Sequence, residues 1–211
     1  MPMRTRTWLC ASLAGAFLNL QAGLTWAQTA PASATEAPHA ALQHDGAHDH
    51  DGAHDFDFLV GSWKIHLKRR LRPLTGSNEW VEFDGTVACQ KVWDGRAELE
   101  QFDVDSPEKH IKIHGLTLRL YDAKSHQWRI YWANADKGAL DVPPVVGAFS
   151  NGRGEFYDQE ERDGRPILVR YVWSGVTTNS PHFEQSFSAD WGKTWETNWI
   201  TDQTRQTPQV R

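Results

Sequence analysis

Between residues 56 and 205 the chain repeats one pattern, in which short apolar runs alternate with tight-turn signals. The turn signals are Asp94-Gly95, Asn151-Gly152, Asp163-Gly164, Trp191-Gly192 and the longer Asp122–His126. The runs are Trp80–Trp93, Ala97–Val104, Ile113–Tyr121, Gln127–Ala133, Val145–Ser150, Glu155–Glu160, Ile167–Trp173, Phe183–Ser188 and Thr194–Thr201. Most have strand length and are rich in β-branched and aromatic residues. No helical apolar periodicity exceeds about two turns, so the pattern predicts an all-β antiparallel meander, closed as a barrel or packed as a sandwich.

The N-terminal segment predicts export. Arg4 and Arg6 precede the apolar stretch Leu9–Leu24, which is interrupted by polar residues and is too short for a stable membrane span. Small residues around Ala27 fit a cleavage site. We therefore expect residues 1–27 to be a signal peptide and the mature protein to be periplasmic or secreted.

Residues 28–55 read as a disordered linker of Ala, Pro, Thr and His. Within it His44, His48, His50 and His54 alternate with aspartates across flexible Gly-Ala spacers. That composition is able to coordinate zinc or copper, although metal sites usually need ligands that a fold holds in place. A solvated tether without a metal is the alternative, and no other cofactor is expected. The linker predicts one domain over residues 56–205, followed by a tail at 206–211.

The net charge limits the classes of partner that this chain can bind, and the cysteine content limits its disulfides. Removal of residues 1–27 leaves 20 basic residues against 27 acidic residues, a net charge of −7. This balance argues against nucleic acid and against anionic membrane surfaces, both of which favour clustered Lys and Arg. Cys89 is the one cysteine left after cleavage, so no intramolecular disulfide is expected, and its place on an apolar face predicts burial. The sequence leaves the oligomeric state open.

Alternation along the runs assigns two faces to each strand. Within Trp80–Trp93 the set Val81, Phe83, Val87 and Cys89 is apolar. Within Ile113–Tyr121 one face carries three leucines, whereas the other carries Thr117, Arg119 and Tyr121. Several runs combine an apolar face with a face that mixes aromatics and single polar groups. In a barrel such a mixed face suits a ligand cavity, but a solvated outer face has the same composition.

Gly61-x-Trp63 resembles the first strand of a lipocalin-like barrel, which bends as it enters the barrel while its indole closes one end. In such barrels a basic side chain from the last strand stacks on this tryptophan, and Arg205 is placed to do so.

Several segments resemble an uncharacterised bacterial family of calycin, or lipocalin-like, type. They are Phe56–Trp63, Gly115–Arg119, Trp128–Ala133, Leu140–Gly147 and Glu184–Trp199. The resemblance covers nearly the whole domain and implies an up-and-down antiparallel barrel of about 8–10 strands with an internal pocket. It implies no settled activity.

The segment Ser188–Trp195 matches the Asp-box pattern Ser-x-Asp-x-Gly-x-Thr-Trp of sialidase-type propellers. Propellers need several copies at a regular period, and this chain has one. We interpret the segment as a braced β-turn, in which Asp190 and Ser188 support the hairpin and the tryptophan packs beneath it.

The leading functional hypothesis is an exported barrel that binds a small, partly apolar ligand. The expected site residues are Arg119, Tyr131, Trp132, Arg170, Trp173, Glu184 and Asn198, and the loop 138–147 is expected to cover the barrel mouth. Either arginine would pair with an anionic ligand group, and Glu184 would orient one of them. A buried polar network that only ties the barrel together is the structural alternative.

Two other function classes remain open at this stage. One is an enzyme, such as a cyclase, isomerase or hydrolase, with Glu184 or His182 as the acid or base. The other is a periplasmic metal-handling protein that acts through the His-Asp tract. His66, His114 and His182 are also candidate haem ligands, although isolated histidines are more often structural.

Overall fold

The structure is a computed structural model that describes residues 51–207. The predicted signal peptide, the first three histidines of the tract and the last four residues of the chain lie outside this range. The strands are β1 Gly61–Arg70, β2 Trp80–Val92, β3 Ala97–Ser106, β4 Ile111–Asp122, β5 Gln127–Asn134, β6 Ala139–Leu140, β7 Val145–Ser150, β8 Arg153–Arg162, β9 Arg165–Ser174, β10 His182–Ser188 and β11 Glu196–Arg205. Three single 3₁₀ turns, η1 Asp57–Leu59, η2 Trp93–Gly95 and η3 Pro107–Lys109, are the helical segments of the described chain.

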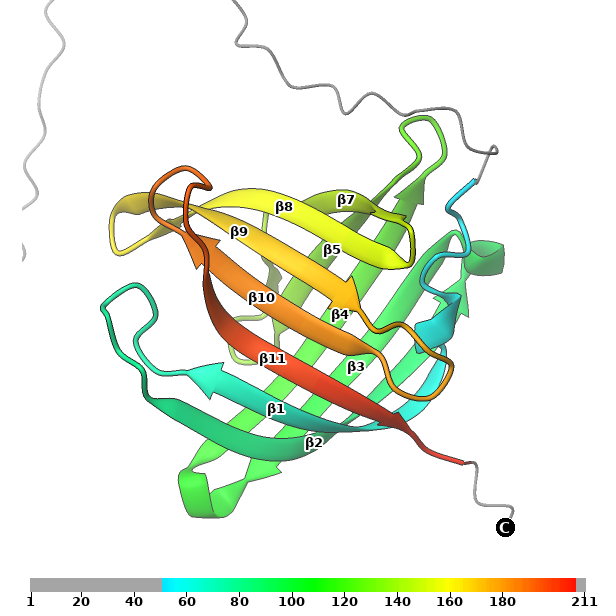
Figure 1. Ribbon diagram of the computed structural model, residues 1–211. Coiled ribbons are helices and arrows are strands. Elements are labelled where there is room, and N and C mark those ends of the chain that lie inside the picture. Colours follow the sequence, from blue (N-terminus) through cyan, green and yellow to red (C-terminus); the bar gives the residue numbers. More distant parts are fainter. Residues whose placement is uncertain (1–50, 208–211) are drawn as a thin grey trace, which may run out of the picture. The chain divides into compact units, whose positions relative to one another are not determined.

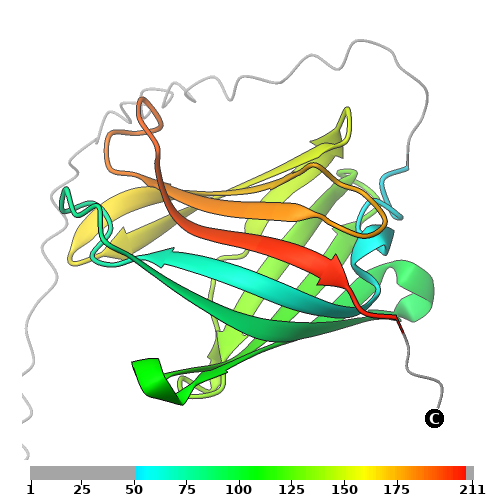
Figure 2. The same cartoon turned by 60° about the horizontal axis from the view of Figure 1, so that its bottom comes forward.

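Ten of the strands form a closed antiparallel barrel (Figure 1). Each strand pairs with the next one along the chain, β11 pairs with β1, and the β4–β5 pairing completes the ring. Figure 2 shows β11 and β1 side by side on the front of the barrel. The two-residue β6 is the exception, because it adds to β5 at Ala133 and Asn134, beside the short β7. The predicted all-β, up-and-down barrel is confirmed.

The predicted turns are present because their residues accept left-handed backbone. Asn151 and Gly152, between β7 and β8, have φ of 52° and 74°. Asp163 and Gly164, between β8 and β9, have the same values. Two successive positive φ angles define the hairpin turn whose twist matches that of the flanking strands. Local sequence chemistry thus fixes where these strands end.

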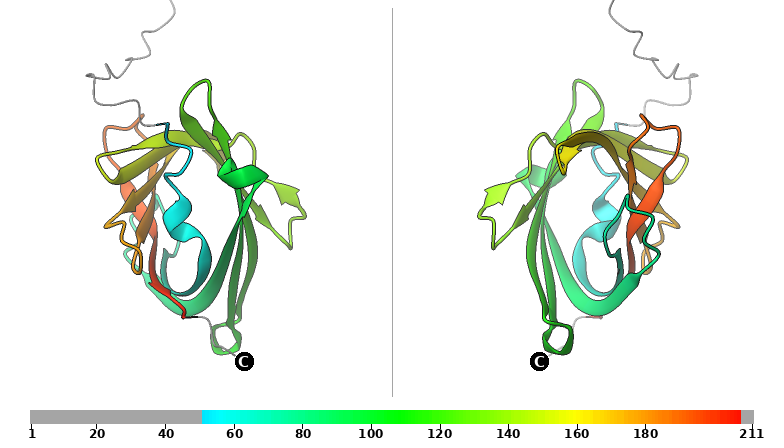
Figure 3. Two further views of the ribbon diagram at one scale, coloured as in Figure 1. Left: turned by 90° about the vertical axis from the view of Figure 1, so that its right-hand side faces the viewer. Right: turned by 90° about the vertical axis from the view of Figure 1, so that its left-hand side faces the viewer.

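One end of the barrel, which we call the floor, is plugged by aromatic side chains. Phe56, just before η1, is fully buried and stacks against Phe156 with ring centroids 5.5 Å apart. Trp63 is also fully buried, and its indole donates to the Leu59 carbonyl at 2.7 Å. Figure 3 shows this segment, in cyan, inside the ring of strands.

Arg205 lies over the Trp63 ring at 4.0 Å, as the sequence predicts. Gly61 makes this approach possible, because its φ is +127° and an added Cβ would lie 2.7 Å from the Arg205 guanidinium. The pair fastens the first strand to the last.

The packed body begins earlier than the sequence suggests. Gly52 is buried, and its carbonyl accepts a hydrogen bond of 2.9 Å from the Trp128 indole. Residues 51–55, which composition assigns to the linker, therefore belong to the ordered body. A polar, Gly-containing segment gives no apolar signal, so its main-chain contact with an indole is invisible in the sequence.

Candidate functional site

The barrel is hollow, with a cavity of about 610 Å³. One wall, from β3, β4 and β5, is largely apolar and presents Phe102, Ile113, Ile130 and Trp132. A cavity of this size lies within the range of pockets that hold small organic molecules.

A glycine on β4 makes room for the largest ring of this wall. An added Cβ at Gly115 would lie 2.0 Å from the Trp132 ring, so glycine is required where the indole crosses β4. The Trp132 ring meets Phe102 edge to face, with centroids 5.7 Å apart. The two strands thus hold a broad aromatic surface toward the cavity.

The opposite wall, from β10 and β11, is mixed, because Phe183, Phe187 and Trp199 line it together with several hydrogen-bonding side chains. The Gln185 amide donates to Asn198 Oδ1 at 2.6 Å, and the Trp199 indole donates to Thr201 Oγ1 at 2.9 Å. Gln203 is buried on the same wall, and its Oε1 has no hydrogen-bond partner within the described chain. The cavity is therefore amphipathic, with both aromatic rings and hydrogen-bonding groups in its lining.

Arg119 is the central charge of the floor and is 2% exposed. Its Nη2 donates to Glu100 Oε2 at 2.8 Å, and the second Glu100 oxygen accepts from Thr117 at 3.0 Å. The guanidinium lies 4.9 Å from the Phe56 ring and 5.8 Å from the Trp173 ring. Burial alone would lower the pKa of Arg119, but Glu100 and other acidic neighbours raise it above its usual range, so the side chain stays charged.

A second carboxyl group borders the floor beneath Arg119. Glu98 Oε2 lies 3.8 Å from Arg119 Nη1 and accepts from the Cys89 thiol at 3.6 Å. Burial, which outweighs the lowering effect of Arg119, raises the pKa of Glu98 to about 7. Burial also raises the pKa of the Cys89 thiol far above its usual range, so this cysteine is a protonated core residue, as predicted.

Three buried donor atoms at the floor lack hydrogen-bond partners within the described residues, and so does the acceptor Glu98 Oε1. The donors are Nε and Nη1 of Arg119 and Nε1 of Trp173, and both side chains line the cavity. Trp173 is 4% exposed, so its indole N–H is not satisfied by bulk solvent. Buried hydrogen-bond donors are normally paired, so unpaired donors on two side chains that line one cavity require a physical explanation.

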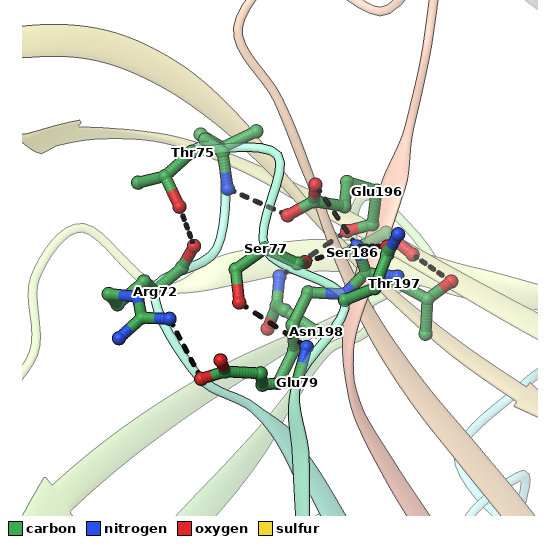
Figure 4. A network of polar contacts seen from close by, with 11 residues as sticks. Arg72, Thr75, Ser77, Glu79, Ser186, Glu196, Thr197 and Asn198 are labelled. Atoms are coloured by element: carbon green, nitrogen blue, oxygen red, sulfur yellow. Dashed lines mark hydrogen bonds and ion pairs between the residues drawn. The ribbon is translucent and has the colours of Figure 1, made fainter.

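The mouth, at the other end, is held together by ion pairs. Glu196, at the start of β11, accepts from the Leu74 main-chain N–H at 2.7 Å and pairs with Arg70 at 3.2 Å. Arg72 pairs with Glu79 at 2.7 Å across the same loop (Figure 4). These contacts tie the loop after β1 to the last strand. Arg70 and Arg72 also line the cavity.

The barrel wall is incomplete near the mouth. β7 pairs with β5 at residues 128–130 only. The β7–β8 register ends at Tyr157, so residues 158–162 of β8 pair with β9 alone. Asp141 and Glu160 line the cavity beside this interruption. The loop 138–147, expected to cover the mouth, instead starts as β6 along β5 and contributes Asp141 to the lining.

The structure brings four of the seven expected site residues to the cavity: Arg119, Trp132, Trp173 and Asn198. Tyr131 alternates with two inward side chains of β5 and lies on the outer face. Arg170 also points outward, 4.5 Å from the Trp195 ring. Glu184 is outside as well, where it accepts from His182 at 3.0 Å. The expected pairing of Glu184 with an arginine of the site is absent.

The three histidines considered as bases or haem ligands all lie on the outer face, each against a carboxylate. His66 lies 2.8 Å from Asp84, His114 lies 2.7 Å from Asp103, and His182 lies 2.6 Å from Asp202. None of the three lines the cavity. The acid or base roles suggested for His182 and Glu184 therefore have no support from their positions.

Sequence reasoning missed Glu98 and Glu100, the carboxylates of the floor. A signal was present, since alternation along β3 places both on the face of Phe102 and Val104. Carboxylates on an apolar face are expected to find a buried cation. The partner, Arg119, is opposite Glu98 in the β3–β4 register.

The Asp-box segment is a braced turn, as predicted. Asp190 accepts from the Thr194 main chain at 2.9 Å and from its hydroxyl at 2.7 Å, and Ser188 accepts from the Gly192 N–H at 2.8 Å. Trp195 packs over the outer face of the barrel against Tyr157, with centroids 6.1 Å apart. The motif has a structural explanation that involves no substrate.

Among residues 51–207, no group of three or more His, Cys, Asp or Glu side chains has a geometry suited to a metal ion. His54, the one described member of the tract, pairs with Asp57 at 3.3 Å. The prediction for His44, His48 and His50 lies outside the described residues. Within the described chain no helix is long and apolar enough to cross a membrane.

Comparisons with known proteins add little to this description. No family model matches the chain, and no curated protein matches it. Among solved structures the chain is similar to Rv2717c from M. tuberculosis, with a TM-score of 0.49 and 11% identity over 74% of this chain and 98% of that one. The resemblance to calycins stays a prediction.

Proposed function

We propose that the protein binds a small, partly apolar molecule inside the barrel. The observation that carries the proposal is the amphipathic cavity of about 610 Å³, in which buried donors of Arg119 and Trp173 have no partner within the described chain. A barrel whose interior only stabilised the fold would be filled by packed side chains, and its buried polar groups would be satisfied. A ligand that fills the hollow and accepts these hydrogen bonds accounts for both features.

The test uses a neutral fluorescent probe, N-phenyl-1-naphthylamine, whose emission rises in apolar surroundings. We expect saturable binding to the purified protein and quenching of the cavity tryptophans. Ile130→Trp places a larger ring in the cavity and should weaken binding at least tenfold, because the added volume occupies the space of the probe.

Tyr131→Trp is the matched control, since the neighbouring side chain lies on the outer face and leaves the cavity unchanged. Circular dichroism verifies that both variants are folded. Equal binding by the two variants would place the probe on the surface and contradict the proposal.

We further propose that the protein is exported, on the strength of the basic, apolar and small-residue pattern of residues 1–27. A fusion of these residues to alkaline phosphatase, which is active only in an oxidising compartment, should give active enzyme in a bacterial host. Replacing Arg4 and Arg6 by glutamate should reduce that activity. An inactive fusion, expressed at the same level, would refute export.

A further inference from the structure

Without a ligand, the floor of the cavity holds no uncompensated positive charge. Arg119 carries one positive charge, and Glu100 lies against it at 2.8 Å. Both oxygens of Glu100 are already hydrogen-bonded, so its charge is directed at Arg119 and Thr117. Arg119 therefore does not act as an uncompensated cation, which is the role the sequence suggested for it.

The same arginine still has hydrogen-bonding capacity. A guanidinium carries five N–H donors in a planar fork. Its hydrogen bond within the described chain runs from Nη2 to Glu100, whereas Nε and Nη1 are buried and have none. The Trp173 indole, 5.8 Å from the guanidinium, adds a second unpartnered donor.

The charge balance of the floor and its free hydrogen-bond donors therefore favour different ligand groups. A carboxylate would satisfy the donors but would place a second anion beside Glu100, with Glu98 only 3.8 Å from the same guanidinium. Like charges in a buried site repel strongly, and a desolvated carboxylate without its own cation is costly. A neutral carbonyl oxygen accepts the same hydrogen bonds without that cost.

We propose that the floor recognises a neutral carbonyl group, such as that of a ketone, ester or amide, and discriminates against a carboxylate of the same shape. This inference rests on the proposed ligand-binding function and names the polar end of that ligand. The aromatic wall of Phe102 and Trp132 receives the apolar part.

The test compares three probes that share one ring system: 2-acetylnaphthalene, 2-naphthoate and 2-ethylnaphthalene. They carry a neutral acceptor, a carboxylate and no acceptor on the same apolar body. Affinities for the full-length mature protein are measured at pH 8 by displacement of N-phenyl-1-naphthylamine. We expect the ketone to bind about fivefold more tightly than the ethyl compound, the size of one net hydrogen bond, and more tightly than the carboxylate.

Two variants separate the hydrogen bond from the charge. Trp173→Phe removes the indole donor but leaves those of Arg119, so it should reduce the advantage of the ketone over the ethyl compound. Glu100→Gln removes the anion that neutralises Arg119 and should improve binding of 2-naphthoate roughly tenfold relative to the ketone. Glu98→Gln should shift the same ratio in the same direction, which keeps the charge argument testable if Glu100→Gln does not fold.

Trp195→Phe is the control, because this tryptophan packs on the outer face and should leave all three affinities unchanged. The inference is overturned if the wild type binds 2-naphthoate as tightly as the ketone, or if the ketone shows no advantage over the ethyl compound. Failure of all three probes and of the fluorescent probe to bind would instead reject the proposed function itself.

Discussion

Two arginines at the same end of the barrel lie over aromatic rings but differ in how their hydrogen bonds are used. Arg205 lies over Trp63, and its Nε, Nη1 and Nη2 donate to the main-chain carbonyls of Thr178, Val60 and Phe58 at 2.6, 2.8 and 2.7 Å. Arg119 lies over Phe56, yet its one hydrogen bond within the described residues goes to Glu100.

The difference indicates that the use of hydrogen-bond donors, and not the charge, distinguishes the structural Arg205 from Arg119 of the proposed site. Arg205 has every nitrogen satisfied by the chain's own carbonyls, so a ligand has nothing to add. Arg119 is the more deeply buried of the two, its side chain lines the cavity, and two of its nitrogens have no hydrogen bond within the described residues. Unused donor capacity next to empty volume is therefore the feature that identifies the candidate site.

The largest expected effect comes from Arg205→Met. The substitution removes three charge-assisted hydrogen bonds and the stacking on Trp63 while keeping much of the apolar stem. We expect the free energy of unfolding, measured by urea denaturation, to fall by roughly 3–5 kcal/mol. The relative affinities for the three naphthalene probes should not change, because Arg205 is not part of the cavity lining.

Arg205→Lys serves as the matched variant. Lysine keeps the positive charge over the indole but loses the planar fork that reaches three carbonyls, so it should fall between the wild type and Arg205→Met. A loss of less than about 1 kcal/mol for Arg205→Met would mean that the network contributes little beyond that of an exposed ion pair, and the structural assignment would fail.

The comparison of Arg205 with Arg119 also explains which parts of the structure the sequence predicted. Arg205 on Trp63 was predictable because it depends on a local Gly-x-Trp signal and on the position of the last strand. The turn dipeptides also placed most strands, since the hairpin geometry depends on two adjacent residues. One strand was missed, β6, because its two residues carry no alternation.

The site was harder to predict because it depends on which face of each strand turns inward. On β4 the leucine face, which looks like core, lies outside, and Thr117 and Arg119 lie inside. The inward choice is made by ring closure through the β4–β5 pairing and by the carboxylates that β3 presents. Those determinants are long-range, so Tyr131, Arg170 and Glu184 were placed at the site by composition alone.

A pH dependence tests the charge balance around Arg119. The pKa of Glu98 is raised from 4.5 to about 7 by burial, so the folded state holds a proton that the unfolded state releases between these values. Stability should therefore fall as pH rises through this window and level off above pH 7. Between pH 5.5 and 8 we expect a loss of about 2 kcal/mol from this group.

Glu98→Gln isolates that contribution, because the amide cannot ionise. Partial burial alone would lower the pKa of His182, but the hydrogen bonds that its ring donates to Asp202 and Glu184 raise that pKa above its usual range. His182 therefore also loses stabilisation as pH rises, but this term is shared by the wild type and the variant. The difference between the two urea-derived stabilities should change by about 2 kcal/mol across the range. A pH-independent difference would show that Glu98 ionises normally.

The smallest expected effect is that of a single hydrogen bond. It is tested on two tryptophans, in the same way as the hydrogen bonds of the two arginines are compared above. Trp128 and Trp173 are buried at the floor, and both meet Phe56 edge to face, with centroids 5.2 and 6.1 Å apart. The Trp128 indole donates to the Gly52 carbonyl, whereas the Trp173 indole has no partner within the described chain. Trp→Phe at either position removes a similar volume, but at position 128 it also removes a buried hydrogen bond to the Gly52 carbonyl, which keeps only its bond from the Asp55 main-chain N–H.

We therefore expect Trp128→Phe to lose about 1 kcal/mol more stability than Trp173→Phe in urea denaturation without ligand. Saturation with 2-acetylnaphthalene should widen the gap between the wild type and Trp173→Phe, since only the wild-type indole bonds the ketone. If the two variants lost equal stability both without the ketone and with it, the Trp173 indole would not be an unpaired donor.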